Sequence, residues 1–234
     1  MTLLGVLAAL AVLGGLVLLA VLFAQRGREG LDLSPAGLLR IYLYLGSLAG
    51  VVVFSVGLAG ILAYVLAAGF GLDVMYGGAP PQPLPAVVAP CPPNQAACTP
   101  APVPVLPPDF KDDRLRRQGE DLVRGVTFGV FGAVFWGAHW WARRALARSD
   151  EQRSGLYRAY LMLGTAIFGI ATIALLPMGV YQALSLAIVP SGPYGYRPGA
   201  GDALSGGLGA LPLWLAYLWF ALRTLRSTPP PASV

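Results

Sequence analysis

Five long apolar stretches, separated by polar or proline-rich segments, make up most of this chain. They cover residues 3–24, 41–68, 125–142, a fourth stretch that begins near residue 157, and 203–222. A helix of about 20 apolar residues spans the hydrocarbon core of a bilayer, so each stretch is long enough to cross a membrane. The pattern predicts an all-α, polytopic membrane protein with five transmembrane helices.

The composition agrees with a membrane protein, because 56% of the 234 residues are hydrophobic and only 12% are charged. The net charge is +5, from 16 basic against 11 acidic residues. In a soluble domain this excess would suggest a nucleic-acid partner. Here most arginines lie at the ends of apolar stretches, where they set membrane topology. We therefore expect the lipid bilayer, and no nucleic acid, to surround the chain.

The first apolar stretch resembles a signal peptide in length but lacks its charge pattern. A signal peptide carries positive charge before its apolar region and a small-residue cleavage site after it. In residues 1–30 nothing charged precedes the stretch, and Arg26 and Arg28 follow it. This order favours a retained N-terminal transmembrane helix whose N-terminus lies outside the cytoplasm.

The third and fifth stretches both end in aromatic residues followed by arginine. Such a band marks the level at which a helix leaves the bilayer. The tryptophans of this predicted interfacial belt are Trp136, Trp140, Trp141, Trp214 and Trp219.

The residues that open and close one pair of apolar stretches recur in a second pair, which predicts an internal repeat. Residues 38–147 form one predicted helical hairpin and residues 155–226 a second. The matched positions are Arg40 with Arg158, Tyr42 with Tyr160, Gly46 with Gly164, Trp136 with Trp214, and His139 with Tyr217. Each hairpin crosses the membrane twice, so both copies point the same way. A pseudo-twofold axis along the membrane normal should then relate them.

The arginine distribution predicts the orientation. Ten arginines lie on one side of the predicted spans and six basic residues on the other, where they alternate with acidic residues. The more basic side should face the cytoplasm. The chain is thus expected N-out and C-in, with residues 69–120 outside and residues 227–234 forming a disordered tail.

The outside segment is rich in proline, with 12 of the 21 prolines between residues 80 and 108. Such a segment favours extended, polyproline-like chain. It contains Cys91 and Cys98, which are too few for a metal site and do not form a redox motif. A disulfide between them is the expectation for an extracytoplasmic loop. The charged run 110–121 should begin the third helix above the membrane, with a solvated face.

Small residues recur along the predicted helices and suggest close helix packing. Gly125, Gly129, Ala133 and Gly137 are spaced every four residues, and Gly46 and Gly50 have the same spacing. Ridges of this kind allow helix backbones to approach each other in a membrane.

His139 is the one candidate for cofactor chemistry, because a single imidazole can ligate a haem iron or a chlorin magnesium. The alternative is an interfacial packing residue, which its match with Tyr217 favours. The sequence contains no motif for a catalytic residue or a metal site, so we expect neither an enzyme nor a bound cofactor.

The segment from Arg40 to Leu45 that opens the first hairpin, and Trp136–Trp141 that closes it, resemble a prokaryotic membrane family catalogued as domain of unknown function 5671. The second hairpin repeats this pattern with Arg158, Tyr160, Trp214 and Trp219, but has Tyr217 in place of histidine. The resemblance covers about residues 38–225. It implies a location and an architecture, and no activity.

These observations favour an accessory or scaffold subunit of a bacterial inner-membrane complex, with bioenergetic complexes among the candidates. The expected partners are other membrane-protein subunits or a second copy of the chain. Two alternatives stay open: a haem- or chlorin-binding protein that uses His139, and a small-molecule permease with a pathway between the hairpins.

Overall fold

The computed structural model describes residues 34–77, 110–146, 154–189 and 198–226, and these segments are helical with no strand among them. Four helices are long and apolar enough to cross a membrane. They are α2 (Pro35–Phe70), α4 (Phe110–Ala145), α5 (Gly155–Ile188) and α6 (Gly201–Arg226), and the short helix α3 (Leu72–Tyr76) follows α2. The all-α fold is therefore confirmed for this part of the chain, and four of its helices are candidate membrane spans. The expected first helix, the proline-rich loop with Cys91 and Cys98, and the tail lie outside it.

The helices begin where local sequence provides a cap or a charged first turn. Ser34 accepts a hydrogen bond from the Gly37 amide at 3.2 Å, and Pro35 follows it in the first turn of α2. Ser154 caps α5 in the same way through the Tyr157 amide. Helix α4 begins at Phe110, well before its apolar stretch. The prediction that the charged run begins the third helix is thus confirmed.

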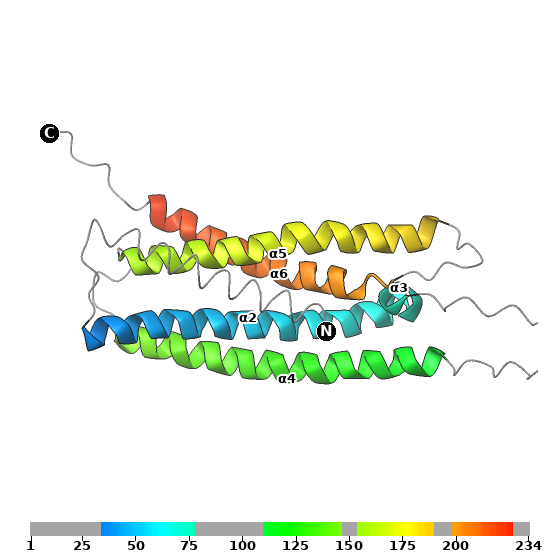
Figure 1. Cartoon of the computed structure of the whole chain (residues 1–234), viewed down its shortest axis with the longest axis horizontal. Helices are drawn as coiled ribbons and strands as arrows, with labels where there is room; N and C mark the ends of the chain where they lie inside the picture. The colour runs from blue at the N-terminus through cyan, green and yellow to red at the C-terminus, as the bar shows by residue number, and fades with distance from the viewer. Residues whose placement is uncertain (1–33, 78–109, 147–153, 190–197, 227–234) are drawn as a thin grey trace, which may run out of the picture.

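The long helices pack as two hairpins, α2 with α4 and α5 with α6 (Figure 1). The hairpins meet mainly where α6 crosses α2, whereas α4 makes few direct contacts with α5 or α6. A twofold axis between the hairpins would superpose α2 on α5 and α4 on α6. The contact between α4 and α5 would then have to be as extensive as the contact between α2 and α6. The predicted pseudo-twofold relation is therefore wrong, because one helix of each hairpin forms most of the joint.

Glycines bring the backbones of α2 and α4 together. A β-carbon built on Gly57 would lie 2.1 Å from the Gly129 nitrogen, and one built on Gly132 would lie 2.3 Å from the Phe54 nitrogen. A β-carbon built on Gly50 would likewise lie 2.6 Å from the Trp136 nitrogen. No side chain fits at these positions, so the close approach depends on glycine.

The predicted ridge on α4 matches this interface only in part. A β-carbon on Gly125 would lie 2.6 Å from the Ile61 nitrogen, but one on Gly129 would be no closer than 3.9 Å to any neighbour. Gly137 has no neighbour within 4 Å of that position. The assignment of Gly137 to helix packing is wrong, because a strict four-residue spacing drifts around a helix of 3.6 residues per turn.

Helix α3 joins the two hairpins at the end of the bundle opposite the predicted tryptophan belt. The Ala200 amide, just before α6, donates a hydrogen bond to the Val74 carbonyl at 2.9 Å. Met75 is almost fully buried there, and β-carbons on Gly199 or Gly201 would collide with its carbonyl oxygen. Asp73 forms an ion pair with Arg114 of α4. This short helix therefore ties α2 to both α4 and α6.

Candidate functional site

His139 lies on α4 with both ring nitrogens engaged by the protein. Its Nδ1 atom is 2.8 Å from the Phe135 carbonyl oxygen, and its Nε2 atom is 3.4 Å from the Tyr42 hydroxyl. A carbonyl can only accept, so Nδ1 carries the hydrogen. In the neutral ring Nε2 then accepts a hydrogen bond from Tyr42. The residue as a whole is only 9% exposed.

The His139 ring packs directly against Gly46 of α2. A β-carbon on Gly46 would lie 2.4 Å from Cδ2 and 2.6 Å from Nε2 of the ring. The Phe135 ring covers the imidazole from its own helix, with 4.1 Å between centroids. His139 therefore fills the space that a side chain at position 46 would otherwise occupy.

Tyr217 makes the corresponding contacts between α5 and α6. A β-carbon on Gly164 would lie 2.3 Å from its ring, and its hydroxyl is 2.7 Å from the Tyr160 hydroxyl. The ring centroids of Tyr160 and Tyr217 are 5.5 Å apart, as are those of Tyr42 and His139. The sequence pairs His139 with Tyr217, and the two residues hold the same kind of place in their hairpins.

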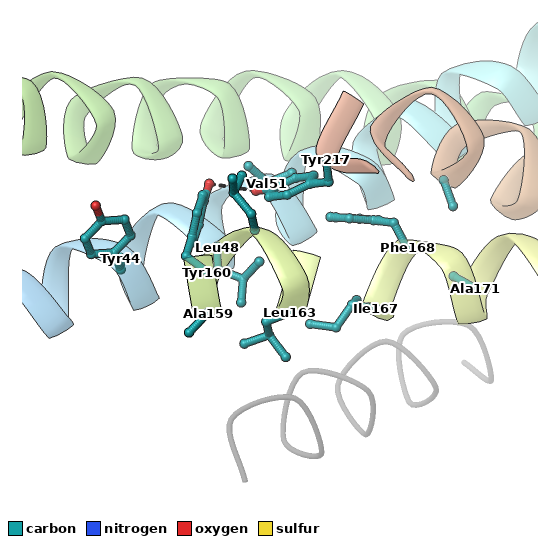
Figure 2. Close-up of a cluster of buried hydrophobic side chains, with 12 residues drawn as sticks. Tyr44, Leu48, Val51, Ala159, Tyr160, Leu163, Ile167, Phe168, Ala171 and Tyr217 are labelled. Carbon is teal, nitrogen blue, oxygen red and sulfur yellow. Dashed lines mark hydrogen bonds between the residues drawn. The ribbon is translucent and has the colours of Figure 1, made fainter. Parts of the chain in front are cut away.

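The pair Tyr160 and Tyr217 forms the centre of a buried cluster between the hairpins, with Tyr44, Leu48 and Val51 of α2 beside it (Figure 2). The Ser47 hydroxyl lies 3.4 Å from the Tyr160 hydroxyl and extends this polar contact to α2. Phe168 stacks on Tyr217 and is fully buried. Polar atoms inside this cluster thus bond to one another, as buried polar groups must.

Arg143 points into this region instead of toward the headgroups. Its guanidinium lies 4.6 Å from the ring centroid of Tyr44 and 5.0 Å from that of Tyr160. Such cation–π contacts stabilise a charge that is partly removed from water. The sequence assigned Arg143 a topological role alone, because nothing in its spacing shows which arginine of the Arg143–Arg144 pair turns inward.

Of the predicted belt, Trp136, Trp141 and Trp219 are exposed, as interfacial residues require.

At the α3 end, Asp121 is the polar residue that sequence reasoning missed. It lies in the charged run expected to be a solvated face, yet it is only 7% exposed. Tyr76 donates a hydrogen bond to its Oδ2 atom at 2.9 Å, and Arg124 pairs with Oδ1. Burial, with help from the bond to Asp121, raises the pKa of the Tyr76 hydroxyl above its usual range. The hydroxyl therefore stays protonated as a donor, and the cluster fastens α3 to α4.

Cavities are present at both ends of the described bundle. One, of about 440 Å³, lies at the α3 end beside Tyr76, Asp121 and Asp202. The other, of about 910 Å³, opens between the C-terminal ends of α4 and α6, with Arg144 and Arg223 in its wall. Within the four described segments no cluster of three or more histidine, cysteine or carboxylate side chains could hold a metal ion.

Comparison of the chain with protein-family models, with curated proteins and with solved structures finds no match. The resemblance to domain of unknown function 5671 therefore stays a prediction. The class is indicated by the helices themselves, because four of those described are long and apolar enough to span a membrane.

Proposed function

We propose that this protein is a non-catalytic accessory or scaffold subunit of a bacterial cytoplasmic-membrane complex. One observation carries the proposal: several polar side chains within the described spans, among them Ser47, Tyr160 and Tyr217, bond to one another or to their own backbone. A catalytic or transport site would need such groups to face a substrate.

The hydrogen bonds of these side chains support the proposal. Ser55, Thr165 and Thr172 each bond to a carbonyl three or four residues earlier at 2.8 Å. Tyr160 and Tyr217 bond to each other, as described above. Proton relays and ion-coupled carriers usually place ionisable groups near the bilayer centre. The charged residues of the described helices cluster toward their ends instead, which is typical of a structural bundle.

We also infer that the two hairpins arose from one unit by duplication. Gly46 faces His139 as Gly164 faces Tyr217. Further along, contacts occur in the same register, with Gly125 against Ile61 in the first hairpin and Ala203 against Gly179 in the second. If the hairpins are equivalent units, Gly164→Ala and Gly46→Ala should lower the thermal unfolding midpoint to a similar extent. A harmless substitution at one site and a severe one at the other would contradict equivalence.

The proposed orientation places the C-terminal ends of α4 and α6 in the cytoplasm. In a Cys91→Ser, Cys98→Ser background, we expect Asp112→Cys to react with a membrane-impermeant maleimide added to intact cells. Leu146→Cys, at the other end of α4, should react only after the membrane is opened. Both positions are exposed, so access to each depends on sidedness. The reverse labelling pattern would overturn the orientation.

The test of the accessory role is purification from native membranes in a mild detergent. We expect other membrane polypeptides to elute with the chain at a stoichiometry that stays constant from one preparation to the next. Recovery of the chain alone, after cross-linking in intact membranes has also failed to trap a partner, would contradict the proposal.

The alternatives require rearrangement of contacts that already exist. A haem or chlorin at His139 would need Nε2, which lies beside Gly46 and the Tyr42 hydroxyl. A permease would need a pathway between hairpins that are joined by the buried tyrosine cluster. Visible absorbance of the purified protein tests the first alternative, and solute uptake into reconstituted vesicles tests the second.

A further inference from the structure

The larger cavity has two chemically different parts. Its mouth carries Arg144 and Arg223, each in the last turn of its helix. Its wall continues toward the bilayer along α4 with Trp136, Ala133 and Gly137. The volume of about 910 Å³ is at the upper end of the range of pockets that bind small molecules, roughly 300–1,000 Å³. A ligand here would meet positive charge at one end and apolar surface along the rest.

Among the described residues, the charge of this end of the bundle is one-sided. The described arginines here are Arg40, Arg143, Arg144, Arg158, Arg223 and Arg226, and the described carboxylates all lie at the α3 end: Asp73, Asp112, Asp113, Glu120, Asp121 and Asp202. The Arg144 guanidinium stacks on Trp140 at 3.9 Å, which orients it while leaving its N–H edge for an anion. The mouth of the cavity is thus suited to a phosphate group.

The small residues explain why the cavity is open. A β-carbon on Gly137 would meet nothing within 4 Å, and α4 makes few direct contacts with α6. The recurrence of small residues on α4 therefore serves two purposes. Gly125 packs against α2, whereas Ala133 and Gly137 leave room between α4 and α6.

We infer that this cavity binds one anionic phospholipid, with its phosphate between Arg144 and Arg223 and an acyl chain along Trp136, Ala133 and Gly137. Basic pockets between transmembrane helices suit anionic headgroups, and the apolar wall requires a ligand that also has a hydrocarbon part. The inference does not depend on the identity of any protein partner.

The test is native mass spectrometry of the delipidated, detergent-purified full chain, titrated with phosphatidylglycerol or with phosphatidylcholine of the same acyl chains. We expect one phosphatidylglycerol to bind more tightly than phosphatidylcholine. Because an arginine near a membrane surface contributes about 1 kcal/mol to anionic-lipid binding, Arg144→Gln and Arg223→Gln should each weaken it about fivefold. Arg226→Gln removes the same charge one turn from the mouth and should have a smaller effect.

A second variant tests the apolar part without changing charge. Gly137→Leu places a side chain in the open space and should abolish binding of the single lipid while the thermal unfolding midpoint in detergent is kept. Equal binding of the two lipids, or equal losses for Arg226→Gln and Arg144→Gln, would overturn the inference. Displacement of the lipid by an equal concentration of soluble glycerol 3-phosphate would also overturn the inference, because the site would then recognise a free phosphate. A dimer that forms in place of the lipid adduct, and is lost in Gly137→Leu, would assign the cavity to a second copy.

Discussion

Gly57→Ala should destabilise the protein markedly, although it adds a single methyl group. The new β-carbon would lie 2.1 Å from the nitrogen and 2.4 Å from the α-carbon of Gly129. These are backbone atoms of α4, so α2 and α4 must separate to relieve the overlap. Overpacking of this kind costs roughly 1–3 kcal/mol. We expect a lower midpoint of thermal unfolding in detergent or nanodiscs, measured by intrinsic tryptophan fluorescence.

Gly129→Ala is the matched control, because it adds the same methyl group to the other side of the same contact. Its β-carbon would lie 3.9 Å from Cδ1 of Ile61 and 4.0 Å from the α-carbon of Gly57, which are ordinary contact distances. We expect an unfolding midpoint close to that of the parent, since alanine also favours a helix over glycine. Equal effects of the two substitutions, in either direction, would show that α2 and α4 do not cross as described.

Gly57 and Gly129 also show the limit of a prediction made from residue spacing along one helix. Repeating small residues identified α4 as a close-packing helix and correctly included Gly125. The same argument included Gly137, which faces the open cavity, and omitted Gly57 and Gly132, which make the closest approaches. Which glycine meets the partner depends on the crossing angle and register of two helices. Neither is encoded in the spacing along one of them.

The spans and their ends were predictable for a different reason. Helix length and apolar composition are local properties that survive in any tertiary arrangement. Asp121 shows the opposite case. Its run of charged neighbours indicated a solvated face, and only the docking of α3, a five-residue helix within a segment expected to be a loop, buries it beside Tyr76.

His139 was recognisable as an unusual residue, but its role depends on a partner 93 positions earlier in the chain, Gly46. The sequence match with Gly164 and Tyr217 pointed to that partner indirectly. The physical link is that a glycine on one helix leaves a space that a ring on the other helix fills. A repeat in sequence can therefore indicate a contact when both copies have glycine at one position and a ring at the other, as Gly46 with His139 and Gly164 with Tyr217 do here.

Gly46→Ala should destabilise the protein through this contact, and His139 should be the cause. The new β-carbon would lie 2.4 Å from Cδ2 of the imidazole, which cannot turn aside freely because Nδ1 is bound to the Phe135 carbonyl. We expect a cost of roughly 1–3 kcal/mol for Gly46→Ala alone. In the double variant with His139→Ala the overlap disappears, so its destabilisation should be smaller than the sum of the two single effects. A coupling of at least about 0.5 kcal/mol is the expected result.

His139→Tyr separates this packing role from cofactor binding. Tyr217 already rests on Gly164 as His139 rests on Gly46, so a tyrosine at position 139 has a precedent in the same fold. We expect His139→Tyr to fold, with a smaller loss of thermal stability than Gly46→Ala, and the parent to show no absorbance band in the visible range. A coloured parent that loses its band in His139→Tyr, while Gly46→Ala unfolds at the parent's temperature, would establish His139 as a cofactor ligand. Strictly additive effects of Gly46→Ala and His139→Ala would show that the two residues do not touch.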